Sequence, residues 1–198
     1  MRSGRTADFL RFMKKELDQL KPFSKTIAVY GSSGIPQDSP AAERAARLGR
    51  LLARARFKIC NGGYMGVMEA CSRGANEAGG VVIGVTCDGF QNRTPNPFLT
   101  EIVRTPDLPE RIAVLMRLAD GYIVLDGNIG TLAELFVAWN VVATGWKKPI
   151  LVVGEDLKKA LYEMQKSTEI GEKQLALLNF VDTADEAVEF LKAYFQDP

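Results

Sequence analysis

The stretch GYIVLDGNIGTLAELFVAW, residues 121–139, joins a strand-like run, a glycine turn and a helix-like run in direct succession. The first run is β-branched and aromatic, as in a buried strand. Glycines and small polar residues follow from Asp126 to Thr131. Beyond them apolar residues recur three and four positions apart, as on one face of a helix. This succession of strand, turn and helix is the repeating unit of an α/β fold.

The same succession recurs along the chain. Short runs rich in Val and Ile that end in glycine or turn residues predict strands at 25–34, 57–63, 81–87, 121–127 and 148–154, with weaker candidates at 100–106 and 178–183. Amphipathic patterns predict helices at 6–20, 40–55, 65–78, 108–119, 130–144, 156–166 and 184–195. The alternation predicts a Rossmann-like, doubly wound α/β domain whose mostly parallel sheet has about six or seven strands and carries helices on both faces.

The 198 residues suit one domain with a well-buried core. We expect a helical extension at 1–24, a central α/β region at 25–155 and a helix–strand–helix segment at 156–198. The stretches 88–99 and 167–177 lack periodicity, and the prolines and asparagines of the first indicate a surface loop or lid. Because right-handed crossovers put the C-terminal ends of the parallel strands at one edge of the sheet, that edge is the expected ligand site.

The charge balance argues against a large charged partner. Lys and Arg number 25 and Asp and Glu 24, a net charge of +1, so we expect no binding to nucleic acid or to an acidic membrane surface. The N-terminal residues lack the apolar core of a signal peptide, and no segment approaches the roughly 20 apolar residues that span a bilayer. We therefore expect a cytoplasmic protein. Cys60, Cys71 and Cys87 have no metal-type spacing and are interpreted as reduced core thiols.

The chain contains no histidine. This excludes catalytic triads that use His and metal sites that His would ligate. We expect neither a bound metal nor a cofactor, and acid–base chemistry falls to carboxylates, Lys, Arg, Tyr, Ser, Thr or backbone amides.

Glycine-rich turns follow three of the predicted strands: YGSSG at 30–34, NGGYMG at 61–66 and DGNIGT at 126–131. Glycine lets backbone N–H groups approach a ligand, and a helix N-terminus offers unpaired donors and a partial positive charge to a phosphate. None of the turns has the spacing of the dinucleotide fingerprint or the P-loop. Together at one edge they predict a site for a phosphorylated small molecule.

Three side chains near these turns could carry chemistry. Thr131 falls in the first turn of the helix predicted at 130–144, where its hydroxyl and N–H can reach a phosphate oxygen, and Glu134 follows on the same face. The pair also has the T-x-x-E spacing of a capping box, and the local sequence leaves both interpretations open. Arg111 lies in the first turn of the helix predicted at 108–119, where the helix dipole disfavours a cation. It is therefore either placed for an external anion or carboxylate, or solvated.

The blocks CNGGYMGVMEACSRGANEAGGVVIGV (60–85) and ERIAVLMRLADGYIVLDGNIGTLAELFVAW (110–139) resemble the LOG family, whose members were once labelled lysine decarboxylase-like. The family pattern is a glycine-rich turn followed by a small-x-Met helix, then an Arg-Lys helix, then a Pro-Gly-Gly-x-Gly-Thr-x-x-Glu turn. The resemblance covers roughly residues 25 to 155, and the spacing between its blocks fits.

This resemblance implies a Rossmann-like homodimer that hydrolyses the N-glycosidic bond of a nucleoside 5′-monophosphate, typically a cytokinin riboside monophosphate, to the free base and ribose 5-phosphate. The family's arginine falls on Arg111 and its catalytic glutamate on Glu134. A carboxylate there can orient the attacking water or stabilise the oxocarbenium ion, while the arginine holds a ligand hydroxyl or orients the acid. The candidate phosphate- or nucleotide-binding residues are Gly31, Ser32, Ser33, Gly62, Gly63, Gly66, Asp126, Gly127, Asn128, Gly130 and Thr131.

Two positions depart from the family pattern. Asp126-Gly127-Asn128 replaces Pro-Gly-Gly, and Ile112 replaces the lysine that follows the arginine. At about 5 Å and an effective dielectric constant near 20, Asp126 would oppose each unit of phosphate charge by roughly 3 kcal/mol. Asp126 has three interpretations: an N-cap for the next helix, an acceptor for a ribose hydroxyl or base amine, or the mark of a protein that binds without cleaving. The alternative function is therefore a non-catalytic carrier or sensor of a nucleotide or phosphorylated cofactor, such as a molybdenum-cofactor carrier.

Two further expectations concern the surroundings of the site. Lysine decarboxylation is not expected, because Lys147 and Lys148 precede a strand at the edge opposite the site. Phe90, Phe98 and Trp139 are candidates for contacts with the base, with core or interface packing as the alternative.

Overall fold

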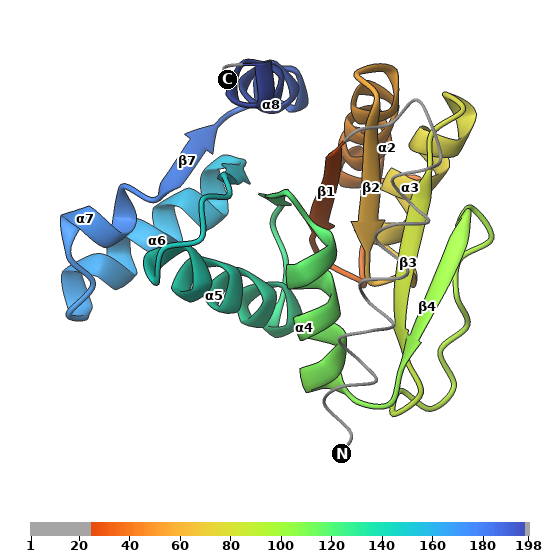
Figure 1. Cartoon of the computed structure of the whole chain (residues 1–198), viewed down its shortest axis with the longest axis horizontal. Coiled ribbons are helices and arrows are strands. Elements are labelled where there is room, and N and C mark those ends of the chain that lie inside the picture. The colour runs from red at the N-terminus through yellow and green to blue at the C-terminus, as the bar shows by residue number, and fades with distance from the viewer. Residues whose placement is uncertain (1–24, 197–198) are drawn as a thin grey trace.

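The computed structural model describes residues 25–196, and its framework is one parallel sheet. The strands are β1 (Lys25–Tyr30), β2 (Phe57–Asn61), β3 (Val82–Cys87), β4 (Glu101–Thr105), β5 (Gly121–Val124), β6 (Ile150–Val153) and β7 (Leu178–Val181). They form a seven-stranded sheet in the order β4-β3-β2-β1-β5-β6-β7, and every neighbouring pair is parallel (Figure 1). The prediction of a doubly wound α/β fold is confirmed, and both weaker strand candidates belong to the sheet.

Helices connect most of these strands. They are α2 (Pro40–Arg54), α3 (Val67–Glu77), α4 (Leu108–Leu118), α5 (Ile129–Ala143), α6 (Glu155–Ser167), α7 (Glu172–Leu175) and α8 (Ala184–Gln196). The stretch at 167–177 that was predicted to be irregular contains the short helix α7, so that prediction is wrong in part. The helix predicted at 6–20 lies outside the described residues.

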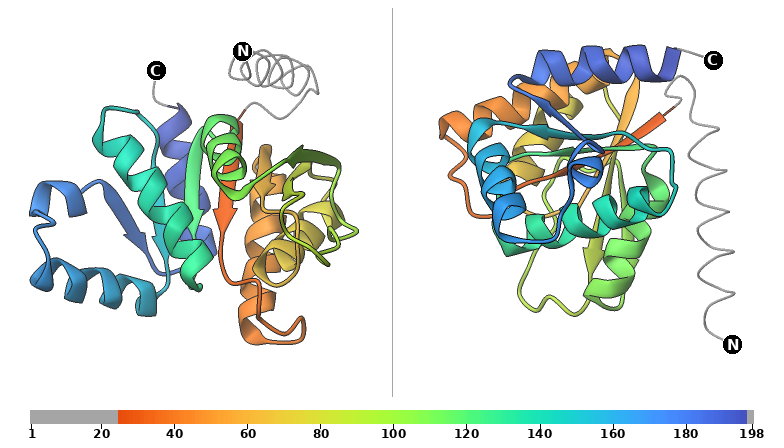
Figure 2. Two further views of the ribbon diagram at one scale, coloured as in Figure 1. Left: turned by 90° about the horizontal axis from the view of Figure 1, so that it is seen from below. Right: turned by 90° about the vertical axis from the view of Figure 1, so that its left-hand side faces the viewer.

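Alternate residues of each central strand enter two separate hydrophobic cores. In β1, Ile27 and Val29 pack against α2, α3 and α8, whereas Ala28 and Tyr30 pack against α4 and α5. Such alternation with both sets buried is what a sheet covered on both faces requires. Figure 2 shows α8 running along the side of the sheet that α2 covers.

The strand order reverses direction between β1 and β5, which are neighbours in the sheet. The chain leaves β1 toward α2 on one face and leaves β5 toward α5 on the other. The two loops therefore diverge and leave a crevice at the C-terminal edge of the sheet. This is the place where doubly wound sheets bind their ligands.

The three cysteines, Cys60, Cys71 and Cys87, are buried and unpaired, as their interpretation as core thiols requires. Burial raises the pKa of the Cys71 thiol to about 12, which makes it a poor nucleophile. Among the described residues, no helix combines the length and the apolar character needed to cross a membrane.

Candidate active site

The three glycine-rich turns meet at the C-terminal edge of the sheet, and Ser32 joins them. Its backbone N–H donates to the carbonyl oxygen of Asp126 at 3.2 Å, and its own carbonyl accepts from the N–H of Val67 at 2.8 Å. These bonds connect the loop after β1 to the turn after β5 and to the first residue of α3. The prediction that the turns converge is confirmed.

Close backbone contact at this junction depends on two of the predicted glycines. A Cβ on Gly66, whose φ is +72°, would lie 2.4 Å from the carbonyl oxygen of Ser32 and would also strike Ser33. A Cβ on Gly31 would lie 2.6 Å from a methyl group of Val67. Glycine at these two positions therefore serves the packing of one turn on another.

Arg111 is buried in the first turn of α4 and is held on several sides. Its Nε donates to the carbonyl oxygen of Val85 in β3 at 2.8 Å, and its Nη1 donates to Oε1 of Glu134 at 3.3 Å. The guanidinium also lies 5.7 Å from the ring centre of Tyr64 and 5.6 Å from that of Phe90. Of the two interpretations of this arginine, the solvated one is wrong, because the side chain is placed for a carboxylate.

Gly62 makes room for this guanidinium. A Cβ on Gly62 would lie 1.6 Å from Nη2 of Arg111 and 2.7 Å from the sulfur of Met68. The sequence predicted Gly62 as part of a phosphate turn, and the structure places it against the guanidinium of Arg111. Gly63, with a φ of +76°, continues the turn, and its N–H donates to the side-chain oxygen of Asn61 at 2.8 Å.

Glu134 occupies the second turn of α5 and is 8% exposed. Burial raises the pKa of its carboxyl to about 7, although the charge of Arg111 and its hydrogen bond act in the opposite direction. A carboxyl that is close to half ionised near neutral pH can both accept and return a proton. A strongly shifted group with a defined charge partner at a ligand edge is a good candidate for chemistry.

The first turn of α5 has a different cap from the one that the T-x-x-E spacing suggested. Asn128 is the N-cap, and its side-chain oxygen accepts from the N–H of Gly130 at 3.2 Å. Thr131 is the third residue of the helix and not its N-cap, so the interpretation of Thr131 and Glu134 as a capping box is wrong. A Cβ on Gly127 would lie 2.1 Å from Oγ1 of Thr131. Because Gly127 has no side chain, the Thr131 hydroxyl can pack closely against the backbone of Gly127.

Asp126 caps a helix, but not the helix that follows it. Its Oδ1 accepts from the N–H of Leu157 at 3.0 Å, in the first turn of α6. Gly154, the N-cap of α6, has no side chain that could do this. The prediction that Asp126 caps a helix is therefore confirmed. The helix is α6 and not the next helix in the chain, and the capped residue is 31 positions away in the sequence.

The loop at 88–99 lies over the turn that follows β2. Asn96 is buried and fixes the loop there: its N–H donates to the carbonyl oxygen of Gly63 at 2.8 Å and its side-chain amide donates to that of Tyr64 at 3.0 Å. Phe90, from the start of the loop, reaches the guanidinium of Arg111. The loop therefore borders the candidate site, as predicted, and Tyr64 is a neighbour of the arginine that the sequence did not single out.

Two buried hydroxyls at the site have no hydrogen-bond partner within residues 25–196, those of Thr131 and Tyr30. Buried polar groups in folded proteins are normally satisfied, so each of these needs an explanation. For Thr131, a phosphate at the first turn of α5 would supply one. Burial raises the pKa of Tyr30, and the charges of Cys60 and Glu134 add to that effect. Tyr30 was not predicted, although its position at the end of a strand that leads into a glycine turn is a usable signal.

Trp139, a candidate for contact with the base, lies outside the site, and Lys148 lies at the opposite edge of the sheet, as expected. Trp139 is buried, and its indole N–H donates to the carbonyl oxygen of Gln174 at 2.8 Å. It packs between α5 and α7 rather than in a ligand space. The Lys148 ammonium donates to the carbonyl of Met116 at 2.8 Å near the C-terminal end of α4, at the edge of the sheet opposite the site.

Comparison with known proteins places these features in a wider group. The family model described as the SLOG cluster4 family matches residues 24–182. The cytokinin riboside 5′-monophosphate phosphoribohydrolase of Rhodococcoides fascians is 29% identical over 121 residues, which make up 60% of this chain and 61% of that protein. The protein of the same name from Mycobacterium tuberculosis is 33% identical over 131 residues, 65% of this chain and 70% of that one. The matched part of this chain therefore spans less than two thirds of the first relative.

Solved structures show the same architecture. The molybdenum cofactor binding protein from the phototrophic bacterium Rippkaea orientalis superposes with a TM-score of 0.70 over 87% of this chain and 98% of that chain, at 22% sequence identity. At this identity the likeness shows the fold alone.

Proposed function

The chain belongs to the SLOG cluster4 family, and from this premise we propose that it hydrolyses the N-glycosidic bond of a nucleoside 5′-monophosphate, releasing the free base and ribose 5-phosphate. The observation that carries the proposal is the buried pair of Arg111 and Glu134, 3.3 Å apart, beside the turns at the C-terminal edge of the sheet. The names of the two phosphoribohydrolase relatives support the same reaction class.

In the proposed reaction, the water oxygen forms a bond to C1′ while the bond from C1′ to the base nitrogen breaks and its electron pair leaves with the base. The ionised form of Glu134 accepts the proton of the water, and its negative charge stabilises the oxocarbenium character of the sugar. Arg111 keeps the carboxylate in position through its bonds to Glu134 and to the carbonyl of Val85. With a pKa of about 7, Glu134 can then give up this proton, which ends on the nitrogen of the departing base, and the carboxylate is restored for the next turnover.

The proposed phosphate seat is the first turn of α5. The residues from Asp126 to Gly130 are exposed there, and the Thr131 hydroxyl directly behind them has no partner in the described residues. A helix N-terminus attracts a phosphate through its free N–H groups and its dipole. The carboxylate of Asp126 accepts a hydrogen bond from the N–H of Leu157, which partly offsets its negative charge. The residue that departs from Pro-Gly-Gly therefore caps the N-terminus of α6. Ile112, the other departure, packs against the core.

Base release from AMP tests the proposal. We expect free adenine and ribose 5-phosphate when the protein is incubated with AMP, or free base from at least one other nucleoside 5′-monophosphate, as resolved by chromatography. Thermal unfolding in the presence of the same nucleotides is the companion measurement. If the nucleotides raise the melting temperature and no base is released from any of them, the hydrolase proposal fails and the alternative of a non-catalytic nucleotide binder takes its place.

We further propose that the protein is a homodimer that pairs through α5. Ile129 is 81% exposed, and Phe136 and Val137, which follow about two turns further along this helix, are 36% and 37% exposed. A helix with apolar residues on its outer face is typical of an interface, and a two-fold contact needs a single self-complementary patch. We expect Phe136→Asp to halve the mass measured by light scattering. Tyr194→Asp, at a comparably exposed aromatic residue on α8, should leave the mass unchanged. A monomeric wild type contradicts the proposal.

A further inference from the structure

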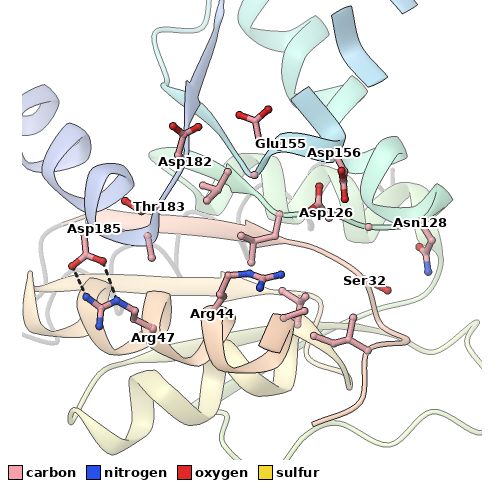
Figure 3. Close-up of a pocket in the computed structure, with 18 residues that line it drawn as sticks. Ser32, Arg44, Arg47, Asp126, Asn128, Glu155, Asp156, Asp182, Thr183 and Asp185 are labelled. Atoms are coloured by element: carbon pink, nitrogen blue, oxygen red, sulfur yellow. Dashed lines mark hydrogen bonds and ion pairs between the residues drawn. The ribbon is translucent and has the colours of Figure 1, made fainter. Parts of the chain in front are cut away.

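A second space opens at the same edge of the sheet, on the face that α2 and α8 cover. Its volume is about 770 Å³, and Figure 3 shows the residues that line it. Apolar side chains of Ile35, Val67, Leu125 and Val153 line it on the side of the sheet. Pockets that hold whole small molecules have volumes of roughly 300–1,000 Å³, so this cavity is far larger than a single phosphate requires.

The cavity and the proposed active site share one wall. Ser32, Gly127 and Asn128, at the junction of the turns, line the cavity, whereas Arg111 and Glu134 do not. A phosphate bound at the first turn of α5 would therefore have the catalytic pair on one side and the cavity on the other. A nucleoside 5′-monophosphate bound for the proposed reaction would direct its ribose toward the catalytic pair, and the free oxygens of its phosphate would then face the cavity.

Most of the charged groups around the cavity already have partners. Asp126 accepts from the N–H of Leu157. Asp185 receives two bonds from Arg47, at 2.9 and 2.8 Å.

Two further acids lie near one lysine. Glu155 and Asp182 are 3.2 and 3.9 Å from the ammonium of Lys158. Glu155 also stands in the first turn of α6, where an acid complements the helix dipole. The acidic rim is thus largely explained by the packing of α6 and α8.

Arg44 and Asp156 are the charged side chains of the cavity that form no ion pair or hydrogen bond within residues 25–196. Figure 3 shows the guanidinium of Arg44 reaching from α2 into the cavity, toward the side where Ser32 and Asn128 lie. Asp156 stands on the opposite wall, in the first turn of α6. Arg44 is thus a cation without a partner in the described residues that faces the proposed phosphate turn. Asp156 is a carboxylate without such a partner on the opposite wall of the cavity.

We propose that this cavity binds a group attached to the 5′-phosphate of the nucleotide, with a second phosphate at Arg44 and a hydroxylated sugar near Asp156. The ligand class is a nucleoside diphosphate or nucleoside diphosphate sugar. Arginine recognises phosphate oxygens through charge-assisted bonds, and a carboxylate accepts bonds from sugar hydroxyls. The placement of the first phosphate rests on the proposed function.

Calorimetric binding of AMP, ADP and ADP-ribose tests this inference. We expect ADP and ADP-ribose to bind at least about tenfold more tightly than AMP, because one charge-assisted contact with phosphate corresponds to roughly ten- to hundredfold in affinity. Arg44→Gln should remove this preference and leave the affinity for AMP within about threefold of wild type. Arg54→Gln is the matched control, since Arg54 is exposed on the same helix and does not line the cavity.

Equal affinity of the wild type for AMP and ADP-ribose overturns the inference, and so does an Arg44→Gln protein that keeps the preference or an Arg54→Gln protein that loses it. Arg44 is exposed, so its substitution should leave the melting temperature of the free protein unchanged. Base release from AMP separates the two proposals. A protein that binds ADP-ribose through Arg44 and cleaves no nucleotide refutes the hydrolase while the cavity site stands; cleavage of AMP with no preference for the longer ligands does the reverse.

Discussion

Glu134→Gln is expected to lower kcat for base release by about 10²- to 10⁴-fold, the range that general acid–base groups contribute. The amide has nearly the shape of the carboxyl and keeps an oxygen that can accept from Arg111, which Glu134 now does at 3.3 Å. It loses the ability to take a proton from water and the charge that stabilises the sugar cation. Because these effects act in the transition state, KM should change far less than kcat. Steady-state kinetics with the best nucleoside monophosphate measure both constants.

The pH profile gives this prediction its control. The pKa of Glu134 is about 7, so the wild-type kcat/KM should rise as the pH increases through 7, when the carboxyl loses its proton. The residual activity of Glu134→Gln should show no such rise. Glu172→Gln, at an exposed acid on α7, should behave as the wild type. A Glu134→Gln enzyme with kcat within tenfold of wild type would refute the proposed role.

The order of strands and helices could be predicted because its signals are local. A strand such as Ile150–Val153 carries its own apolar run, and a helix such as Ala184–Gln196 starts with its own acids. The short helix Glu172–Leu175 was missed because four residues are too few to show a period. Because all the strands of the sheet are parallel, the glycine-rich turns after β1, β2 and β5 necessarily lie at its C-terminal edge. Their convergence could therefore be predicted without any long-range signal in the sequence.

The site could be predicted only where motif and topology sufficed. Arg111 and Glu134 were singled out by their places in two predicted helices and paired by the resemblance to the LOG family, and the fold brings them to 3.3 Å. The role of Asp126 could not be found in this way, because its partner Leu157 belongs to another helix. The orphaned hydroxyl of Tyr30 and the cavity beside Arg44 likewise depend on contacts between distant segments.

Gly62→Ala is expected to reduce kcat/KM by about a hundredfold, although it touches no reacting atom, because a misplacement of about 1 Å in a catalytic group can cost that much. The added methyl would lie 1.6 Å from Nη2 of Arg111, which is too close for both atoms to keep their positions. The end of a flexible side chain gives way more readily than backbone, so the guanidinium should move and the chain should still fold. Kinetics and the melting temperature, measured on one preparation, separate these effects.

Gly34→Ala is the matched control, because a Cβ there would meet nothing closer than the Ser32 hydroxyl at 3.8 Å. Gly63→Ala would be a poor substitute, since the φ of +76° strains any L residue.

Arg111 lowers the pKa of Glu134 by its charge and hydrogen bond. Its displacement should therefore shift the midpoint of the pH profile upward, a change that loss of folded protein would not produce. Suppose that Gly62→Ala left both the midpoint and kcat/KM unaltered. The position of the Arg111 guanidinium would then control neither the pKa nor the activity of the Glu134 carboxyl, and the proposal that the two residues act together would be refuted.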